Sequence, residues 1–140
     1  MFIKQVSVFV ENETGKLAEI TRVLADNNVD LKASCIAESV DFGILRCIVE
    51  DPEAVVALLK ANGYAANLSD VVAVELDDRP GGFADVLGIL AKEDIGIGYV
   101  YSTIRSKDSK AMIVMQVAET GKVIDILVAN GVKLYKASEL

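Results

Sequence analysis

The sequence of 140 residues contains no histidine. This absence removes the commonest general base and the commonest metal ligand of proteins. A phosphate-binding loop and a dinucleotide fingerprint are missing as well, since Gly96-Ile-Gly98 stands without the rest of either motif. The carboxylates fall mostly in turns and on polar helix faces. We therefore expect no enzymatic activity, no metal and no cofactor.

Clusters of basic residues and long apolar runs are also missing. Residues 1–70 carry 6 basic and 11 acidic residues, residues 71–140 carry 8 and 10, and the net charge is −7. Phosphate neutralisation needs concentrated Lys and Arg, so we expect neither nucleic acid nor an anionic membrane as a partner. The apolar runs fall short of the ~20 residues of a membrane span.

The expected location follows from the start of the chain and its two cysteines. Residues 1–6 enter a strand pattern at once, so we expect no signal peptide. Two cysteines without a signal peptide then favour a cytoplasmic protein in a reducing environment.

The first half of the sequence is repeated in the second half. Gly15 aligns with Gly81 at an offset of 66, and Gly63 aligns with Gly131 at an offset of 68. Two residues were therefore added between these anchors, and we place them in the hairpin turn at residues 106–109. The repeat predicts two domains, residues 1–69 and 70–140. Because about 70 residues fold alone only marginally, we expect the copies to share an interface.

Both copies show the element order β-α-β-β-α-β. Strands are predicted at residues 5–11, 29–38, 42–50 and 64–68, and again at 71–76, 97–105, 110–117 and 132–136. Helices are predicted at residues 16–27, from Pro52 to a stop at Asn62-Gly63, at 81–93 and at 121–130, with Asp51 as the N-cap of the second.

This order is the ferredoxin-like unit of the α+β class. It implies four antiparallel strands in the order 4-1-3-2, with both helices on one face of the sheet. The second strand of each copy then lies on an edge. Pairing of these two edges would join the tandem units side by side into one eight-stranded antiparallel sheet.

The two cysteines are predicted to face each other across the first hairpin. Cys35 and Cys47 are symmetric about a turn centred near residue 41, and the second copy has Tyr101 and Met115 at the corresponding positions. Ordinary packing explains such an exchange better than thiol chemistry does.

The turn before the first helix of each copy resembles that of the ACT domain, a small amino-acid-binding regulatory module. The most specific stretch is Asp77-Asp78-Arg79-Pro80-Gly81-Gly82-Phe83, which is similar to the D-x-P-G-x-L/F turn of that family. The first copy, Glu13-Thr14-Gly15-Lys16, keeps the glycine and lacks the proline. The resemblance covers the whole chain as two tandem copies. It implies a free amino acid bound where this turn of one copy meets the second strand of the other.

The backbone chemistry of a helix start favours the same location. The start of a helix exposes unpaired N–H groups and carries partial positive charge, which favours a carboxylate, and glycine permits close approach. Lys16 or Arg79 can reach that carboxylate, and the amino group has candidate acceptors nearby in Glu11, Asn12, Asp77 and Asp78. The candidate ligand-binding residues are Asn12, Glu13, Thr14, Gly15, Lys16, Leu17, Ala33, Ser34, Cys35, Asp78, Arg79, Pro80, Gly81, Gly82, Phe83, Tyr99 and Val100.

Structural alternatives remain open for these residues. The two glycines can simply relax a tight turn, Lys16 and Arg79 can be solvated charges, and Asn12 and Asp78 can be helix caps. Tyr99 and Tyr101 alternate with Val100, so one of the two faces is core or interface.

We therefore expect an amino-acid-binding regulatory or sensor protein that acts as a homodimer or with a partner enzyme. One alternative is an interaction subunit of an amino-acid biosynthetic enzyme, such as one like acetolactate synthase, with little ligand binding of its own. The proline-less first turn favours that alternative. A second alternative, an enzyme on the same fold, is disfavoured by the missing histidine and nucleophile cluster.

Overall fold

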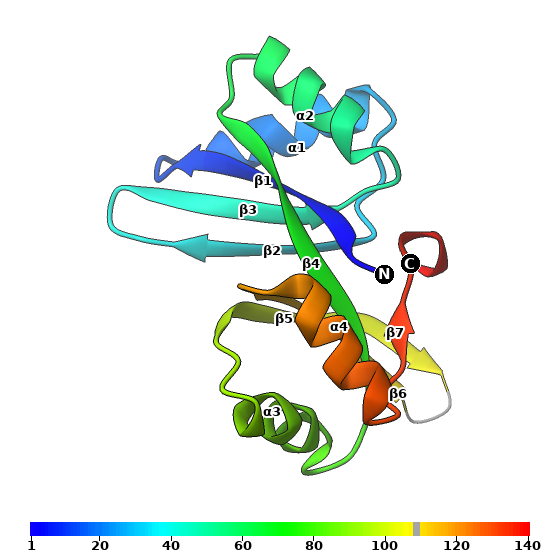
Figure 1. Ribbon diagram of the computed structural model, residues 1–140. Helices are drawn as coiled ribbons and strands as arrows, with labels where there is room; N and C mark the ends of the chain where they lie inside the picture. The colour runs from blue at the N-terminus through cyan, green and yellow to red at the C-terminus, as the bar shows by residue number, and fades with distance from the viewer. Residues whose placement is uncertain (108–109) are drawn as a thin grey trace. The chain divides into compact units, whose positions relative to one another are not determined.

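The computed structural model describes residues 1–107 and 110–140 (Figure 1). Within these residues it contains four α-helices, seven strands and a C-terminal 3-10 turn, Ala137–Glu139. Its contacts divide the chain into two compact units. The first unit is Lys4–Ser69, and the second is Asp70–Leu140 together with Met1–Ile3.

The first unit has the strand order β2-β3-β1-β4, which is the predicted order 4-1-3-2. β3 pairs antiparallel with both β1 and β2. The elements are β1 (Ile3–Glu11), α1 (Lys16–Asp26), β2 (Ala33–Glu38), β3 (Phe42–Ile48), α2 (Pro52–Ala61) and the first part of β4 (Ala66–Asp77).

The second unit repeats this topology with the order β5-β6-β4-β7. Its elements are the second part of β4, α3 (Gly82–Lys92), β5 (Ile97–Lys107), β6 (Lys110–Val117), α4 (Thr120–Ala129) and β7 (Leu134–Tyr135). The α+β class and the antiparallel pairing are thus confirmed.

The prediction of eight strands is wrong, because β4 runs without a break through both predicted strands at 64–68 and 71–76. Neither glycine nor proline occurs between Ala66 and Asp77, so nothing in the sequence forces a turn there. β4 therefore serves as the last strand of the first unit and the first strand of the second. Pairing between β2 and β5 stays a prediction.

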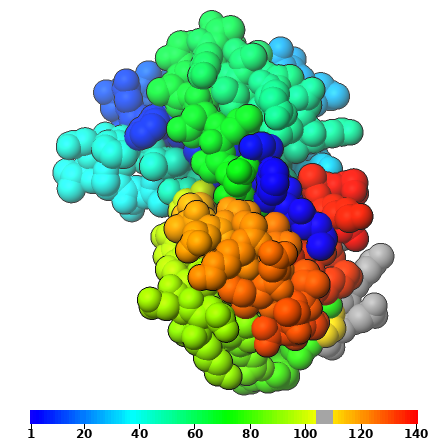
Figure 2. Space-filling view, in the orientation of Figure 1, coloured from blue at the N-terminus to red at the C-terminus, as the bar shows by residue number. Residues whose placement is uncertain are grey.

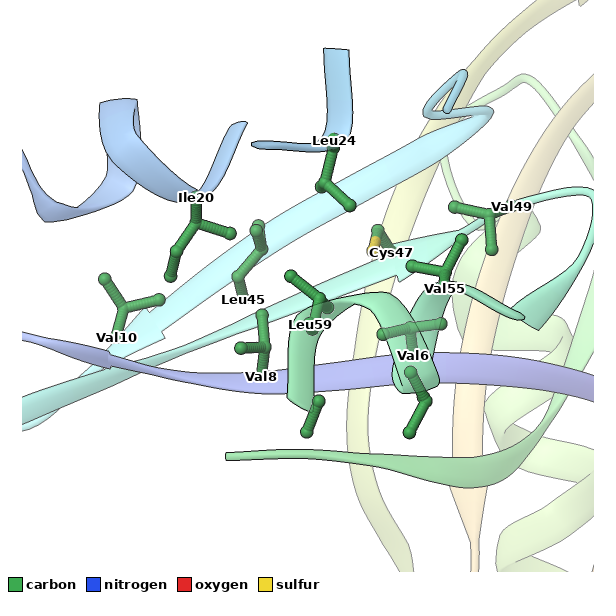
Figure 3. Close-up of a cluster of buried hydrophobic side chains, with 12 residues drawn as sticks. Val6, Val8, Val10, Ile20, Leu24, Leu45, Cys47, Val49, Val55 and Leu59 are labelled. Atoms are coloured by element: carbon green, nitrogen blue, oxygen red, sulfur yellow. The ribbon is translucent and has the colours of Figure 1, made fainter. Parts of the chain in front are cut away.

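Both helices of each unit pack on one face of its sheet, as predicted. In the first unit, alternate residues of β1 (Val6, Val8 and Val10) meet Leu24 of α1 and Leu59 of α2 (Figure 3). The second core has the same plan, with β4 and β6 packed against α3 and α4; its members include Val72, Val74, Val86, Leu90, Ile113, Met115, Val123 and Leu127.

The predicted start and stop of α2 are confirmed. The Asp51 carboxylate accepts a hydrogen bond from the Ala54 N–H at 3.1 Å, and Pro52 occupies the first helical position. Gly63 follows the helix with φ +86°, a left-handed conformation that glycine adopts without strain.

The hairpin register corrects the prediction for the cysteines. Cys35 lies opposite Arg46, and Cys47 lies opposite Ser34, so the two thiols point to opposite faces and remain free. The turn occupies residues 39–42, with the Ser39 N–H donating to the Phe42 carbonyl at 2.8 Å. Its centre is thus half a residue earlier than predicted, and a register slip of one residue reverses a side chain's face.

The register also locates the two residues added in the second copy. Ala37 pairs with Ile44 in the first unit, and Thr103 pairs with Met112 in the second. The addition therefore lies between Thr103 and Met112. The turn predicted at 106–109 includes residues 108 and 109, which lie outside the described residues.

Candidate functional site

The turn between β1 and α1 places a glycine at the start of the helix. Gly15 is the N-cap of α1 with φ +91°, and no side chain caps the helix. The Glu13 N–H donates to the Glu11 carbonyl at 2.8 Å, and the Lys16 N–H donates to the Glu13 carbonyl at 3.2 Å. A side chain at Gly15 would strain this left-handed conformation.

The turn between β4 and α3 repeats the glycine cap and these two hydrogen bonds. Gly81 is the N-cap with φ +92° and again no side-chain cap. The Arg79 N–H donates to the Asp77 carbonyl at 2.9 Å, and the Gly82 N–H donates to the Arg79 carbonyl at 3.0 Å. The proline of the second turn is therefore not needed for this shape, since the first turn reaches it without one.

The interpretation of Asn12 and Asp78 as helix caps is wrong, because the glycines occupy the N-cap positions. Asn12 instead ties the first turn to the hairpin between β2 and β3. Its side-chain amide donates to the Val40 carbonyl at 3.1 Å, and its N–H donates to the Asp41 carbonyl at 3.3 Å. The starts of α1 and α3 thus keep their N–H groups free of side-chain caps.

The second turn requires glycine at residue 82, because the backbone of Asp77 comes close to it. A Cβ atom at this residue would stand 2.0 Å from the Asp77 carbonyl oxygen. The first copy carries Lys16 at the corresponding position, so this tight contact belongs to the second copy.

Lys16, Glu19 and Tyr64 form a polar group beside the first turn. The Lys16 Nζ lies 3.6 Å from Glu19 Oε2, and the Tyr64 hydroxyl donates to Glu19 Oε1 at 2.6 Å. The hydrogen bond from Tyr64, and next the charge of Lys16, lower the pKa of Glu19. The same hydrogen bond raises the pKa of Tyr64 to about 12. Glu19 is therefore held as a carboxylate.

Arg79 lies across the second turn and is held there by carboxylates. Its Nη2 is 2.6 Å from Asp85 Oδ2, and its Nε is 3.6 Å from Asp77 Oδ2. Its Nη1 also donates to the Pro80 carbonyl at 3.2 Å. These contacts place a guanidinium at the start of α3, where it can meet a ligand carboxylate.

A hollow lies beside each turn, and the two hollows are built from corresponding residues of the repeat. The first, the aromatic hollow, measures about 360 Å³ and is lined by Phe9, Glu11, Lys16, Glu19, Ile20, Phe42, Asn62, Gly63, Tyr64 and Ala65. The second, the charged hollow, measures about 290 Å³ and is lined by Glu75, Leu76, Asp77, Gly82, Asp85, Val86, Ile89, Lys110, Gly131, Val132 and Lys133.

The two hollows differ most at one diagonal pair of neighbouring strands, in which Phe9 lies opposite Ile44 and Phe42 lies opposite Glu11. In the first unit, the Phe9 and Phe42 rings lie 5.5 Å apart at 51°, and they are 47% and 42% exposed. Glu75 and Lys110 take these places in the second unit, with Lys110 Nζ 4.0 Å from Glu75 Oε1. An aromatic pair in one copy is thus an ion pair in the other.

The charged hollow holds a chain of alternating charges. Lys133 lies 3.1 Å from Glu75, the Tyr135 hydroxyl donates to Glu75 at 2.5 Å, and Lys110 pairs with Asp77. The hydrogen bond from Tyr135 is the main cause that lowers the pKa of Glu75. The contact with Lys110 lowers the pKa of Asp77 in the same way.

A larger hollow of about 680 Å³ lies elsewhere in the first unit, where α1 ends and α2 begins. Asn28, Asp30, Lys32, Glu50 and Asp51 are among the residues around it. It contains none of the candidate ligand-binding residues, so we centre the candidate site on the two turns.

The candidate residues of the second strands are not brought to the turn of their own unit. In the first unit, Cys35 lies opposite Arg46, which lies opposite Ser7. Ser7 is four residues before Glu11, or about 13 Å at the rise of a strand. A site that combines such a turn with Ala33, Ser34 or Cys35 would therefore need a strand from another copy.

The second strand of the second unit divides its residues between two faces. Val100 packs against the core of the second unit, so its side chain faces the helices. Tyr99, its neighbour in an alternating strand, points to the opposite face. This confirms that one face of the predicted alternation is core.

The residues that distinguish the hollows are not among those predicted from the sequence. They are Phe9, Glu19, Phe42 and Tyr64 in the first unit and Glu75, Asp85, Lys110 and Lys133 in the second. A signal for them exists in the repeat, since Phe9 aligns with Glu75 at offset 66 and Phe42 with Lys110 at offset 68. When two positions change together from aromatic residues in one copy to charged residues in the other, the change indicates that their side chains are in contact.

Residues 1–107 and 110–140 contain no group of three histidine, cysteine or acidic side chains placed to hold a metal ion. In the same residues, no helix has the length and apolarity that crossing a membrane would require.

Comparison with known proteins gives one related structure of high identity and several of low identity. Protein BT0572 from Bacteroides thetaiotaomicron is 43% identical, with a TM-score of 0.92, over 99% of this chain and 95% of that one. The regulatory subunits of aspartate kinase from Thermus thermophilus and Thermus flavus both have a TM-score of 0.63. They are 13% and 12% identical over 90% of this chain and 91% and 90% of theirs, so they share the fold.

A search of curated proteins gives no match. A family model is more informative, because the model described as "ACT domain pair" matches residues 1–140. Two β-α-β-β-α-β units, each with a glycine-capped turn before its first helix, agree with that description. The chain therefore belongs to the ACT domain pair family.

Proposed function

We propose that the chain is a regulatory module that binds a free amino acid at one of its glycine-capped turns. One observation carries the proposal. Two helix starts have no side-chain cap, and each lies beside a hollow lined by charges of both signs. Such a place suits a zwitterion, which presents a carboxylate and an ammonium group at a fixed separation.

The proposed contacts differ between the turns. At the first turn, the N–H groups after Gly15 and the Lys16 ammonium hold the carboxylate, while Glu19 receives the ammonium group. At the second turn, Arg79 holds the carboxylate, and Asp77 or Asp85 receives the ammonium group. Asn12, Glu13, Thr14 and Leu17 surround the first turn, and Asp78, Pro80, Gly81, Gly82 and Phe83 surround the second.

A second strand from another copy completes the proposed site. Ala33, Ser34 and Cys35 of β2, or Tyr99 and Val100 of β5, would supply the wall that the turn lacks. The ligand then stabilises that arrangement, and the change in arrangement is the signal. The aspartate kinase regulatory subunits of the same fold support a regulatory role.

Isothermal titration of the folded protein against each of the twenty amino acids tests the proposal. We expect saturable heat from at least one of them, with the affinity of a sensor in the micromolar to millimolar range. Absence of heat from all twenty, with folding confirmed by circular dichroism, contradicts the proposal.

The variants Gly15→Ala and Gly81→Ala identify the turn that binds. Their φ values are +91° and +92°, so a methyl group costs each about the same 1–2 kcal/mol of backbone strain. Each variant is thus the control for backbone strain in the other, and the methyl group at residue 81 in addition meets Arg79 Nη1 at 3.3 Å. We expect the variant at the binding turn to lose affinity at least about tenfold, and equal affinity in both variants and wild type contradicts binding at either turn.

A second candidate function is that of an interaction subunit of an amino-acid biosynthetic enzyme. It is favoured by apolar exposure on the β2–β3 hairpin, which projects at the surface of the first unit (Figures 1 and 2). Ile36 and Val40 are 48% and 88% exposed there. Co-purification of the chain from its native host would recover a stable enzyme complex under this alternative.

A further inference from the structure

We propose that one end of the first unit docks on a partner protein whose contact surface is apolar at its centre and basic at its rim. We call this end the acidic tip; it consists of residues 9–15 and 36–44. The inference goes beyond the amino-acid site and does not depend on it. It gives the second candidate function a surface and a partner chemistry.

The two segments of the acidic tip are held together by three contacts. β1 pairs with β3 as far as Glu11 and Phe42, and the rings of Phe9 and Phe42 lie 5.5 Å apart. The Asn12 side chain then donates to the Val40 carbonyl at 3.1 Å. The β1–α1 turn and the β2–β3 hairpin therefore form one surface.

Large apolar side chains lie exposed on both faces of the acidic tip. Phe9 and Phe42 alternate with core residues of their strands, so they lie on the sheet face away from the helices, and almost half of each is exposed. Ile36 lies opposite Leu45, a core residue, so it lies on the other face. Val40, in the turn between β2 and β3, is almost fully exposed. Such a group of exposed apolar side chains on a projecting hairpin (Figures 1 and 2) indicates a contact with another protein.

The charges of the acidic tip are all negative. Glu11, Glu13, Glu38 and Asp41 are exposed, and the two segments contain neither Lys nor Arg. Within residues 1–107 and 110–140, none of these four carboxylates forms an ion pair. Four negative charges without an ion-paired cation favour a partner that brings Lys or Arg to the rim of the contact.

The second copy shows that the fold does not require these features. Its corresponding segments, residues 75–81 and 102–112, contain four acidic and four basic residues, so their charges cancel. Glu75 and Lys110 replace the two phenylalanines, and Lys110 pairs with Asp77. The apolar and acidic character of the tip belongs to the first copy, as expected of a surface that serves binding rather than folding.

The same charges argue against a second copy of the chain as the occupant. A symmetric contact between two acidic tips would bring four negative charges against four, and like charges across an interface weaken it. The occupant is therefore a different protein, with apolar side chains to cover Phe9, Phe42 and Val40 and with basic residues around them.

Photo-cross-linking from the acidic tip tests the proposal. The full chain with p-benzoylphenylalanine in place of Val40 is expressed in its native host and irradiated, and the adduct is mapped by mass spectrometry. The same label in place of Val128, which is 50% exposed on α4, is the matched control. We expect a partner adduct from residue 40 and not from residue 128, and we expect Lys and Arg to outnumber Asp and Glu in the cross-linked segment.

Two double variants of the full chain then separate the apolar contribution from the charged one, by calorimetric titration with the purified partner. Phe9→Glu with Phe42→Lys installs the residues of the second copy and keeps the net charge, and we expect the affinity to fall at least about tenfold. Glu38→Gln with Asp41→Asn removes two charges and keeps the apolar side chains. We expect this variant to bind about threefold more weakly at low salt, with a smaller dependence on salt.

Glu53→Gln with Asp125→Asn removes two exposed charges elsewhere and should bind the partner like wild type. The proposal is overturned if residue 40 gives no adduct or only an adduct between two copies of the chain. An acidic cross-linked segment, or wild-type affinity in both tip variants, overturns it as well. Glu38 and Asp41 line neither hollow, so their variant should keep the heat of amino-acid binding, and absence of that heat from wild type contradicts only the proposed function.

Discussion

Glu75 makes polar contacts with three side chains of the second unit. Its carboxylate accepts from Tyr135 and lies within reach of Lys133 and Lys110. Its side chain is 17% exposed, so these contacts operate partly out of water. The pKa of Glu75 is lowered by the hydrogen bond from Tyr135 and by the two lysines, which links its ionisation to folding.

We expect Glu75→Gln to remove a pH-dependent part of the stability. A carboxyl group whose pKa is lower in the folded state stabilises folding above its unfolded pKa, near 4.5, and loses this effect as the pH falls through the folded pKa. The difference in unfolding free energy between wild type and Glu75→Gln should be constant from pH 6 to pH 8, at up to about 1 kcal/mol, and shrink below pH 4.5. Urea denaturation at each pH measures it.

Tyr135→Phe supplies the control for this effect. It removes the donor that contributes most to the lowered pKa, so the pH-dependent difference should become smaller in that background. A difference that instead grows as the pH falls would show that Glu75 is destabilised in its ionised form.

For individual residues, the sequence alone located the two glycine turns but not the contacts made by the side chains around them. Gly15 and Gly81 could be found because a left-handed residue needs glycine and leaves a mark in the sequence. Whether Asn12 caps a helix or ties a hairpin depends on contacts between segments 28 residues apart. The sheet face to which the Cys35 side chain points depends on a half-residue shift in the centre of the hairpin turn. The amino-acid composition does not indicate that shift.

The start of α3 lies very close to the end of β4. A Cβ at Gly82 would come within 2.0 Å of the Asp77 carbonyl oxygen, whereas one at Gly88, in the same helix, would have no atom within 4 Å. The two glycines therefore differ in the reason for their presence.

We expect Gly82→Ala to destabilise the protein by about 1–3 kcal/mol, because backbone must move to admit the methyl group. Gly88→Ala should stabilise it by about 0.5–1 kcal/mol through the lower entropy of the unfolded chain. Chemical denaturation of both variants measures the two effects, and a Gly82→Ala protein as stable as wild type would show that α3 is free to shift.

Periodicity predicted the elements well and their ends less well. Alternation found β1 and β6, and the cap at Asp51 fixed the start of α2. The strand predicted at 29–38 begins only at Ala33, because Asn28 turns with φ +56° and the Val29 N–H still donates to the Leu24 carbonyl at 3.0 Å. The last predicted strand, 132–136, shrinks to Leu134–Tyr135.

For the whole molecule, the important element is β4, which pairs with β1 of the first unit and with β6 and β7 of the second. β4 is an edge strand in the first unit and a central strand in the second. Unfolding of either unit would therefore remove a strand on which the other unit depends. We therefore expect the chain to unfold in one cooperative transition.

The chain carries its own probes for this prediction. Both cysteines lie in the first unit, and three of the four tyrosines, Tyr99, Tyr101 and Tyr135, lie in the second. Cys47 is fully buried, and burial raises its pKa to about 11, so it should react with a thiol reagent only on unfolding. Cys47 labelling and tyrosine fluorescence should give the same urea midpoint.

Asp70→Pro is the matching variant, since proline cannot donate a hydrogen bond to a neighbouring strand. It interrupts β4 at the boundary of the two units and should separate the two midpoints. Separate midpoints already in wild type would contradict the coupling that β4 is expected to provide.

The topology of each unit could be predicted because both copies of the repeat show the same order of strands and helices. The number of strands could not, since it depended on whether the chain turned near Ser69. The absence of a turn leaves no local signal in the sequence. Two predicted strands separated by two residues show the same sequence pattern whether they form one continuous strand or two.

The near identity of the two turns, φ +91° at Gly15 and φ +92° at Gly81, has a consequence for engineering. Similar turns carry two different sets of wall residues, so each copy is a guide to changes in the other. Wall residues could be transplanted from the second copy to the first, whereas the reverse transfer must keep Gly82, because a Cβ there would stand 2.0 Å from the Asp77 carbonyl oxygen. A single natural chain thereby offers a starting point for sensors that respond to two metabolites at once.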